Sequence, residues 1–297
     1  MNIDTMVRFS GINNRDDAMR ISLEQDNKYE DIYPLCQAYN VDIDDTYMIS
    51  SRKGKVSLLQ GTDIHSLWSN GNKCFFVDGI NLYQLMDDFS VLALRTVTRG
   101  ARVRFVEFND KIYYTNGHEC GYVKDYTAHA LADPCLNFKM SLPHGQLIEV
   151  FMGCIYMAVD NILYVTDPLC DYFDIRTGYM IFKDKIKMVC GVENGIYVAD
   201  SKTWFLSGKG NDDFERTLVT DSSVVMYTDV KIDGSDISES SNGIGAIWTG
   251  DDGICFGDGN GKVRNESSDR YILSPHEQGA AYIREVGQVK HYVNSIF

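Results

Sequence analysis

The sequence lacks any run of about 18 apolar residues, the length that a membrane-spanning helix requires. Its first residues, MNIDTMVRFSGINNRDD, also lack the charged and then apolar pattern of an export signal. Basic residues are scarce, and the formal net charge of −14 disfavours the phosphate contacts of a nucleic-acid-binding protein. We therefore predict no membrane association and no direct DNA binding, although DNA could pass near an acidic wall without adhering to it.

The sequence also has no closely spaced cysteine pair and few prolines. The eight cysteines contain no C-x-x-C pair, and their wide spacing fits neither a zinc ribbon nor a compact disulfide framework. Several stand in apolar runs such as KCFFV and GCIYMAV, where a free cysteine packs as a small hydrophobe. We predict reduced, buried cysteines and synthesis in a reducing cytoplasm. Only five prolines beside 18 tyrosines are typical of a chain rich in paired strands.

One unit of about 40 residues recurs along the chain. Each copy is a strand that ends in aromatic residues, a short polar turn and a second strand. The copies span 72–86, 109–125, 153–167, 194–208 and 244–258. Their aromatic anchors Phe76, Tyr113, Tyr156, Tyr197 and Trp248 lie 37, 43, 41 and 51 residues apart. The last interval is the longest because the polar segment 229–242 is predicted to be an inserted loop.

Further strands surround these hairpins. Strand patterns precede them at 101–108, 145–152 and 184–192, and outer strands are predicted at 91–97 and 179–183. Three or four strands in each period are typical of a β-propeller blade, so we predict an all-β propeller. A pair of β-sandwiches or a β-solenoid is the alternative.

The two ends of a propeller must meet if its edges are to be hidden. The segments 45–61 and 279–297 both alternate like strands, and the second has a turn signal at Val286-Gly287. We predict that they complete one shared blade, which gives about six blades in all, with five or seven as alternatives.

The N-terminal residues do not follow this period. We predict an extended N-terminal arm over 1–44 and a single propeller domain over 45–297. The arm is polar with isolated apolar anchors, among them Phe9, Ile12, Ile21 and Leu23, which we predict to contact a neighbouring subunit or another partner. A disordered tail is the alternative.

The segment GAIWTGDDGICFGDGNGKVRNES, residues 245–267, has the carboxylates and glycines of a ligand-binding loop. However, Val263 follows Lys262 where a phosphate-binding loop needs Ser or Thr, and no helical pattern comes after it. A calcium loop would need a third oxygen ligand where Lys262 stands. We therefore predict two successive turns, with Trp248, Ile254 and Phe256 in the core.

No catalytic constellation is recognisable. The six histidines are isolated, and no Gly-x-Ser-x-Gly elbow exists. The stretch SKTWFLSGKGNDDF only faintly resembles the Asp-box of sialidase propellers, and the arginines show no carboxylate-clamping pattern. We predict no enzymatic activity, no cofactor and no metal.

Three blocks together resemble the propeller-type structural proteins of tailed-bacteriophage virions. The first joins Gly11 to Asn14 with Asn40-Val41-Asp42 and continues through Arg52 and Gly54. The second spans 163–208. The third carries Trp248, Gly253, Ile254, Gly257 and Asn265, with Gly250 in place of the family's usual serine.

This resemblance implies a non-enzymatic virion subunit that forms a homo-oligomeric ring in the tail or head-to-tail region, near packaged DNA. It would act as a tail hub, nozzle or adaptor-like protein, be assembled in the cytoplasm of the host bacterium, and bind other tail or portal proteins. The length of 297 residues leaves little room for the extra domains of nozzle proteins.

An alternative function is recognition of a host receptor or glycan by the propeller. Loop aromatics, of which Tyr126 and Tyr172 are candidates, would then form the binding surface.

Overall fold

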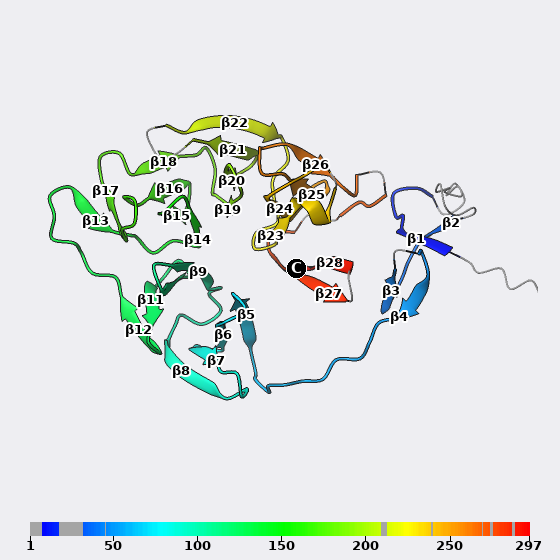
Figure 1. Ribbon diagram of the computed structural model, residues 1–297, viewed down its shortest axis with the longest axis horizontal. Helices are drawn as coiled ribbons and strands as arrows, with labels where there is room; N and C mark the ends of the chain where they lie inside the picture. Colours follow the sequence, from blue (N-terminus) through cyan, green and yellow to red (C-terminus); the bar gives the residue numbers. More distant parts are fainter. Residues whose placement is uncertain are drawn as a thin grey trace, which may run out of the picture.

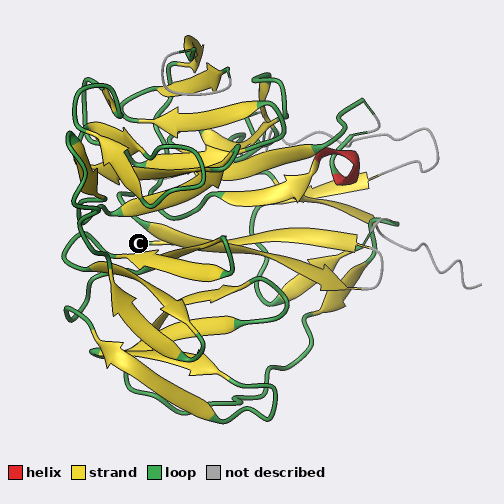
Figure 2. Cartoon of the chain, turned by 60° about the vertical axis from the view of Figure 1, so that its left-hand side comes forward, coloured by secondary structure: helices red, strands yellow, loops and turns green. Residues whose placement is uncertain are grey.

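The computed structural model describes residues 8–17, 32–44, 46–208, 213–238, 240–268, 270–273, 276–286 and 289–297. Strands make up the regular structure of these residues, apart from one short 3-10 helix, η1 (Gly234–Asp236), drawn in red in Figure 2. Across this described part of the chain, no helix combines the length and apolar character of a membrane span. The all-β prediction is confirmed.

Five four-stranded antiparallel sheets are arranged in a ring, and they are numbered here as blades 1 to 5 (Figure 1). In four of them the strands pair in chain order, and in blade 3 the order is β14-β15-β16-β18. Blade 1 contains β5 (Ile64–Ser69), β6 (Cys74–Asp78), β7 (Asn81–Leu85) and β8 (Val91–Thr96). Blade 2 contains β9 (Arg104–Phe108), β10 (Lys111–Thr115), β11 (Cys120–Lys124) and β12 (Thr127–Ala130).

The later blades follow the same plan. Blade 3 contains β14 (Leu147–Phe151), β15 (Cys154–Val159), β16 (Ile162–Val165) and β18 (Tyr179–Ile181), beside a small pair of β13 (Lys139–Ser141) and β17 (Tyr172–Asp174). Blade 4 contains β19 (Met188–Gly191), β20 (Gly195–Ala199), β21 (Thr203–Ser207) and β22 (Glu215–Thr220). Blade 5 contains β23 (Val230–Asp233), β24 (Ile244–Gly250), β25 (Gly253–Gly257) and β26 (Val263–Asn265). All five predicted hairpins are present, and the propeller prediction is confirmed.

The core lies between neighbouring blades. A separate apolar cluster fills each contact from blade 1 to blade 5, because the alternating residues of each sheet bury both of its faces. Phe75 of blade 1 stacks on Phe105 of blade 2 with 5.7 Å between ring centroids. Tyr197 of blade 4 meets Trp248 of blade 5 at 5.3 Å. Four of the five aromatic anchors that define the sequence period belong to these inter-blade clusters: Tyr113, Tyr156, Tyr197 and Trp248.

The sixth position of the ring holds a two-stranded hairpin, β27 (Gly279–Val286) and β28 (Val289–Ile296). Ile283 and Tyr292 of this hairpin pack on an apolar cluster of blade 5. The Tyr292 hydroxyl donates a 2.7 Å hydrogen bond to the Thr228 carbonyl, and burial raises the pKa of Tyr292 to about 12. Strand β27 ends at Val286 and β28 begins at Val289, which agrees with the turn signal in the sequence at Val286-Gly287.

The N-terminal strands form a separate module, defined here as the described residues 8–17 and 32–51. It holds a parallel pair, β1 (Arg8–Ile12) and β2 (Ile32–Leu35), and an antiparallel pair, β3 (Val41–Ile43) and β4 (Ile49–Ser51). The predicted shared blade is not formed, because β4 is the only strand among the described residues 46–61 and its partner is β3, not β27 or β28. Charged residues and Gly54 interrupt the alternation after β4, so residues 52–63 connect the module to blade 1 as an extended strap (Figure 1).

The segment 229–242 is not the loop that its polarity predicts. It contains β23, the strand of blade 5 that pairs with β24, followed by η1. Ile232 is buried, and its neighbours Lys231 and Asp233 are exposed. This alternation is that of a strand, although the segment is mostly polar.

Candidate functional site

The glycine-rich segment 245–267 forms strands and turns of blade 5 and not a ligand site. The Asp258 carboxylate accepts 2.9 Å hydrogen bonds from the backbone N–H groups of Asn260 and Lys262, which fixes the turn. A Cβ at Gly257 would lie 2.5 Å from the ring of Tyr197, so only glycine fits there. Within the described ranges, no three His, Cys, Asp or Glu side chains converge as a metal site would require. Trp248 and Phe256 are buried as predicted, whereas Ile254 is half-buried.

Two ion pairs cross the centre of the ring. Arg104 of blade 2 meets Asp229, next to β23, at 2.5 Å, with 25% and 4% of their side chains exposed. Lys231 of blade 5 meets Glu149 of blade 3 at 2.9 Å. These residues line a central cavity of about 630 Å³ between the inner strands and β27. The pairs tie blade 5 to the blades across the channel.

Burial and partner charges act in opposite directions on these cations. Burial opposes the charge of Arg104, but the attraction and hydrogen bond of Asp229 outweigh it and raise the Arg104 pKa. Burial likewise opposes the charge of Lys231, while Glu149 raises the Lys231 pKa above its ordinary value. Burial also raises the pKa of the Cys190 thiol, which keeps it protonated beside the pairs. The centre of the ring is thus a charge-paired, neutralised cluster.

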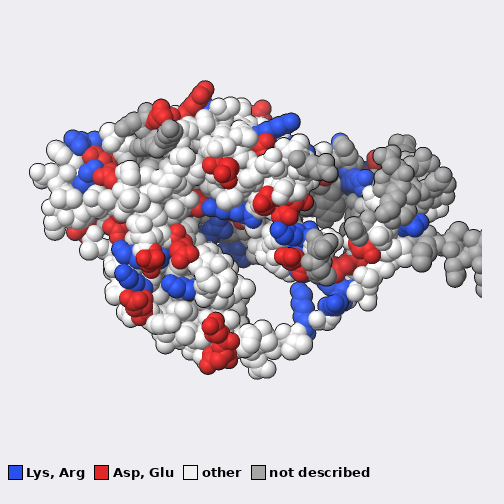
Figure 3. All heavy atoms as spheres, viewed as in Figure 1, with Lys and Arg blue, Asp and Glu red and all other residues white. Residues whose placement is uncertain are grey.

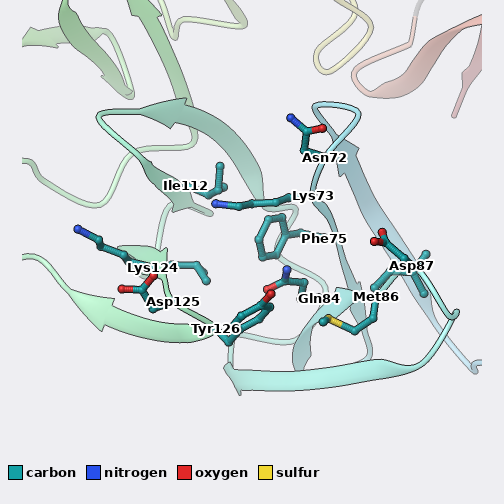
Figure 4. A pocket seen from close by; sticks show the side chains of 12 residues that line it. Asn72, Lys73, Phe75, Gln84, Met86, Asp87, Ile112, Lys124, Asp125 and Tyr126 are labelled. Carbon is teal, nitrogen blue, oxygen red and sulfur yellow. The ribbon is translucent and has the colours of Figure 1, made fainter.

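A second cavity, of about 250 Å³, lies between blades 1 and 2. Its lining comes from β6, β7 and the residues next to them in blade 1, and from β10, β11 and the turn between β11 and β12 in blade 2 (Figure 4). Phe75 and Ile112 contribute fully buried apolar side chains. Tyr126 closes one side and is 60% exposed.

The carboxamide of Gln84 lies within this cavity, between Phe75 and Tyr126 in Figure 4. Gln84 is only 6% exposed, and across the described residues its side chain has no hydrogen-bond partner. Its amide atoms are not among the fully buried polar atoms that lack a hydrogen-bond partner, so they are open to the cavity. Their hydrogen bonds are therefore available to a ligand that enters it.

Four charged side chains complete the lining: Lys73, Asp87, Lys124 and Asp125. In the part of the chain that the structure describes, none of the four forms an ion pair or a side-chain hydrogen bond. Two positive and two negative groups together leave the cavity without a net charge, and all four remain available to a ligand.

Tyr126 occupies an unusual backbone position. Asp125 and Tyr126 form the two-residue turn between β11 and β12, with φ angles of 49° and 63°. Such turns favour Asn and Gly, because a side chain in this left-handed region is strained. Aromatic residues also have positive φ angles elsewhere in the chain, as at Phe89 and Phe138, so the backbone angle alone does not assign a function to Tyr126.

The residues predicted for partner contacts do not converge on one surface. Phe9 and Ile12 lie half-buried in β1, where Phe9 aligns with Tyr33 and Ile12 with Leu35 of β2. Ile21 and Leu23 lie outside the described residues. Tyr172 lies half-buried in β17, in another sheet from the turn that carries Tyr126. Among the four that the structure describes, Tyr126 is the one that lines either of the two cavities above.

Sequence reasoning missed Gln84 and the four charged residues around it. One signal was available: the stretch VKDYTAH places a tyrosine where a tight hairpin turn prefers Asn or Gly. A second lay in NLYQLM, where Gln84 shares the strand face of Leu82, a core position.

No family model matches this sequence, and neither does any curated protein. Solved structures do match. The chain is similar to a virginiamycin B lyase from Staphylococcus aureus at 11% identity and a TM-score of 0.50, over 79% of this chain and 85% of the lyase. It is also similar to BBS1N in a complex with ARL6DN, at 10% identity and a TM-score of 0.50, over 84% of this chain and 80% of that chain. At such identities the likeness shows the propeller fold alone.

The expectation that the chain is not an enzyme is corrected by these comparisons. A virginiamycin B lyase is an enzyme with the same fold, so neither the propeller nor the lack of a familiar catalytic motif excludes catalysis. The prediction relied on recognisable local motifs, whereas a catalytic site is defined by the geometry of its groups and can join residues far apart in the sequence.

Proposed function

We propose that the chain is a β-propeller subunit of a tailed-bacteriophage particle, and that it assembles into a ring through its N-terminal module. The observation that carries the proposal is the polar docking of this module on the propeller. Two of the blocks behind the family resemblance meet there, since Gly11 to Asn14 adjoins the loop after β26, which follows directly on the third block.

The docking contacts are few and specific. The Asn14 side chain donates to the Ile272 carbonyl at 3.1 Å and accepts from the Ile272 N–H at 2.8 Å. Arg270 donates to the Ser10 carbonyl at 3.1 Å. Asp42 of β3 forms a 2.8 Å ion pair with Arg284 of β27.

The module is joined to the rest of the chain in a way that permits exchange between copies. All five apolar clusters of the described core begin at Trp68 or later, so none includes the module. The strap leaves Val56 and Leu58 exposed, and an opening is visible between it and the propeller in Figure 3. The same polar contacts can therefore form with the propeller of a neighbouring copy, as in other domain-swapped oligomers.

Charge reversal at Asp42 and Arg284 tests this assembly. The Asp42→Arg and Arg284→Asp variants each place like charges across the contact, so each is expected to lose the oligomer. An equimolar mixture of the two restores opposite charges wherever unlike copies meet, and the oligomer should return. Mass measured by light scattering checks both results.

Asp221→Arg is the matched control, because Asp221 pairs with Lys202 on the surface of blade 4, away from the module. Its mass should equal that of the natural chain. Assembly through the module is ruled out if the single variants keep the natural mass, or if their mixture fails to recover it.

A second candidate function is recognition of a host glycan, favoured by the cavity between blades 1 and 2. Aromatic faces bind the C–H surface of sugars, and hydroxyl groups need both donors and acceptors nearby. Tyr126 supplies the aromatic ring, and Gln84, Lys73 and Asp87 supply donors and acceptors within the cavity. This candidate is compatible with a place on the phage tail.

The Tyr126→Asn variant separates binding from folding. Asparagine tolerates the positive φ of this turn, so the melting temperature should stay the same or rise slightly. Retention on host cells should fall because the exposed ring is lost. Tyr179→Ala, which removes a similarly exposed tyrosine from blade 3, should leave retention unchanged. Equal retention by both variants would contradict a role for this cavity.

A further inference from the structure

We infer that the cavity between blades 1 and 2 binds a single neutral pyranose that carries an acetamido group, an N-acetylhexosamine unit. This inference rests on the second candidate function, because it names the sugar that the same cavity would take.

The buried carboxamide of Gln84 carries the inference. A carboxamide offers one acceptor oxygen and two N–H donors, and an acetamido group offers one acceptor and one donor. The two amides therefore match as a pair of hydrogen bonds. Gln84 has no partner within the described structure and its amide atoms are open to the cavity, so both hydrogen bonds are available to such a ligand.

The apolar walls fit the methyl group of an acetamide. Phe75 and Ile112 are both fully buried and line the same cavity as Gln84, and Met86 adds a flexible thioether. In Figure 4 the amide of Gln84 lies against the ring of Phe75, with Met86 on one side. A plain hydroxyl in place of the acetamido group would leave these walls without an apolar partner.

The charged lining argues for a neutral ligand. Lys73 and Lys124 balance Asp87 and Asp125, so a phosphate or carboxylate would meet as much repulsion as attraction. Sugar hydroxyls instead donate to the carboxylates and accept from the ammonium groups. The ring of Tyr126 lines the cavity and is largely exposed, so it can cover the C–H face of a pyranose bound there.

The size of the cavity limits the ligand. Its volume of about 250 Å³ is below the usual range of roughly 300–1,000 Å³ for pockets that hold drug-sized ligands. One sugar ring fits this space, and further rings of a glycan would extend into solvent.

An NMR titration with paired probes tests the inference on the full chain. The probes are the methyl glycosides of N-acetylglucosamine and N-acetylgalactosamine, each beside the methyl glycoside of its parent sugar without the acetamido group. The natural chain is expected to bind at least one acetamido probe about tenfold or more tightly than the parent sugar, as the loss of a paired amide implies.

Two variants connect this preference to Gln84. Gln84→Met removes the amide and keeps the length of the side chain, so the preference should collapse while the melting temperature stays level or rises. Gln60→Met makes the same chemical change at an exposed strap position and should keep the preference.

The outcomes separate the inference from the function on which it rests. If the natural chain binds acetamido and parent probes equally, the acetamido assignment is wrong and glycan binding survives. If the preference persists in Gln84→Met, the amide is not the recognition group and the inference fails. If neither kind of probe binds but host cells retain the chain, the inference fails while binding of a larger glycan stands. If host cells do not retain it either, both are overturned.

Discussion

Replacement of Asp229 by alanine is expected to lower the free energy of unfolding by about 3–5 kcal/mol. Asp229 is the partner of Arg104 across the centre of the ring, and both side chains are largely withdrawn from solvent. Removal of one partner leaves the other as an uncompensated buried charge. This lowers the free energy of unfolding by more than the attraction within the pair contributes. Urea denaturation measures this loss as a lower midpoint concentration, provided that the m-value is the same for the variant and the natural chain.

The control for this variant is Asp221→Ala. Asp221 pairs with Lys202 at 2.5 Å, but 76% of its side chain is exposed. Exposed pairs contribute about 0–1 kcal/mol, so the control should differ little from the natural chain. Equal effects of the two variants would show that the ring does not depend on its central ion pair.

The Trp248→Ala variant is expected to lose about 3–5 kcal/mol, since it leaves a large cavity between blades 4 and 5. Trp248 is 1% exposed and contacts the ring of Tyr197 in a cluster that also includes Met188 and Cys255. The neighbouring strands are fixed by their own ladders and cannot close the space fully.

Thermal unfolding of Trp248→Ala beside Tyr39→Ala measures this contribution. Tyr39 is an exposed aromatic residue of the N-terminal module, so its replacement should change stability by no more than about 0.5 kcal/mol. A loss in Trp248→Ala as small as in this control would mean that the blades are not joined through their aromatic anchors.

The blade pattern was predictable because it is local. Each hairpin consists of a few consecutive residues whose alternation and turn chemistry appear directly in the sequence, as between Asp78 and Asn81 of blade 1. Strand β23 escaped detection because Lys231 pairs across the ring with Glu149, so a polar residue faces inward. The reason for a lysine at this position is therefore a contact between distant blades, which the local sequence pattern does not reveal.

The way the ring closes and the cavity between blades 1 and 2 were not predictable, because both depend on contacts between residues far apart in the sequence. The two terminal segments each alternate like strands, but the ion pair between Asp42 and Arg284 takes the place of strand pairing. The alternation of NLYQLM places Gln84 on a core face, yet only the turn of blade 2 makes that position the wall of a cavity. The burial was predictable from the sequence, whereas the missing hydrogen-bond partner was not.

Analysis of purified particles tests the proposed role most directly. Once a phage genome is shown to encode this sequence, mass spectrometry of its virions should detect the chain in several copies per particle, and imaging of labelled particles should place it in the tail or head-to-tail region. Detection in infected cells together with absence from purified particles would contradict the proposal.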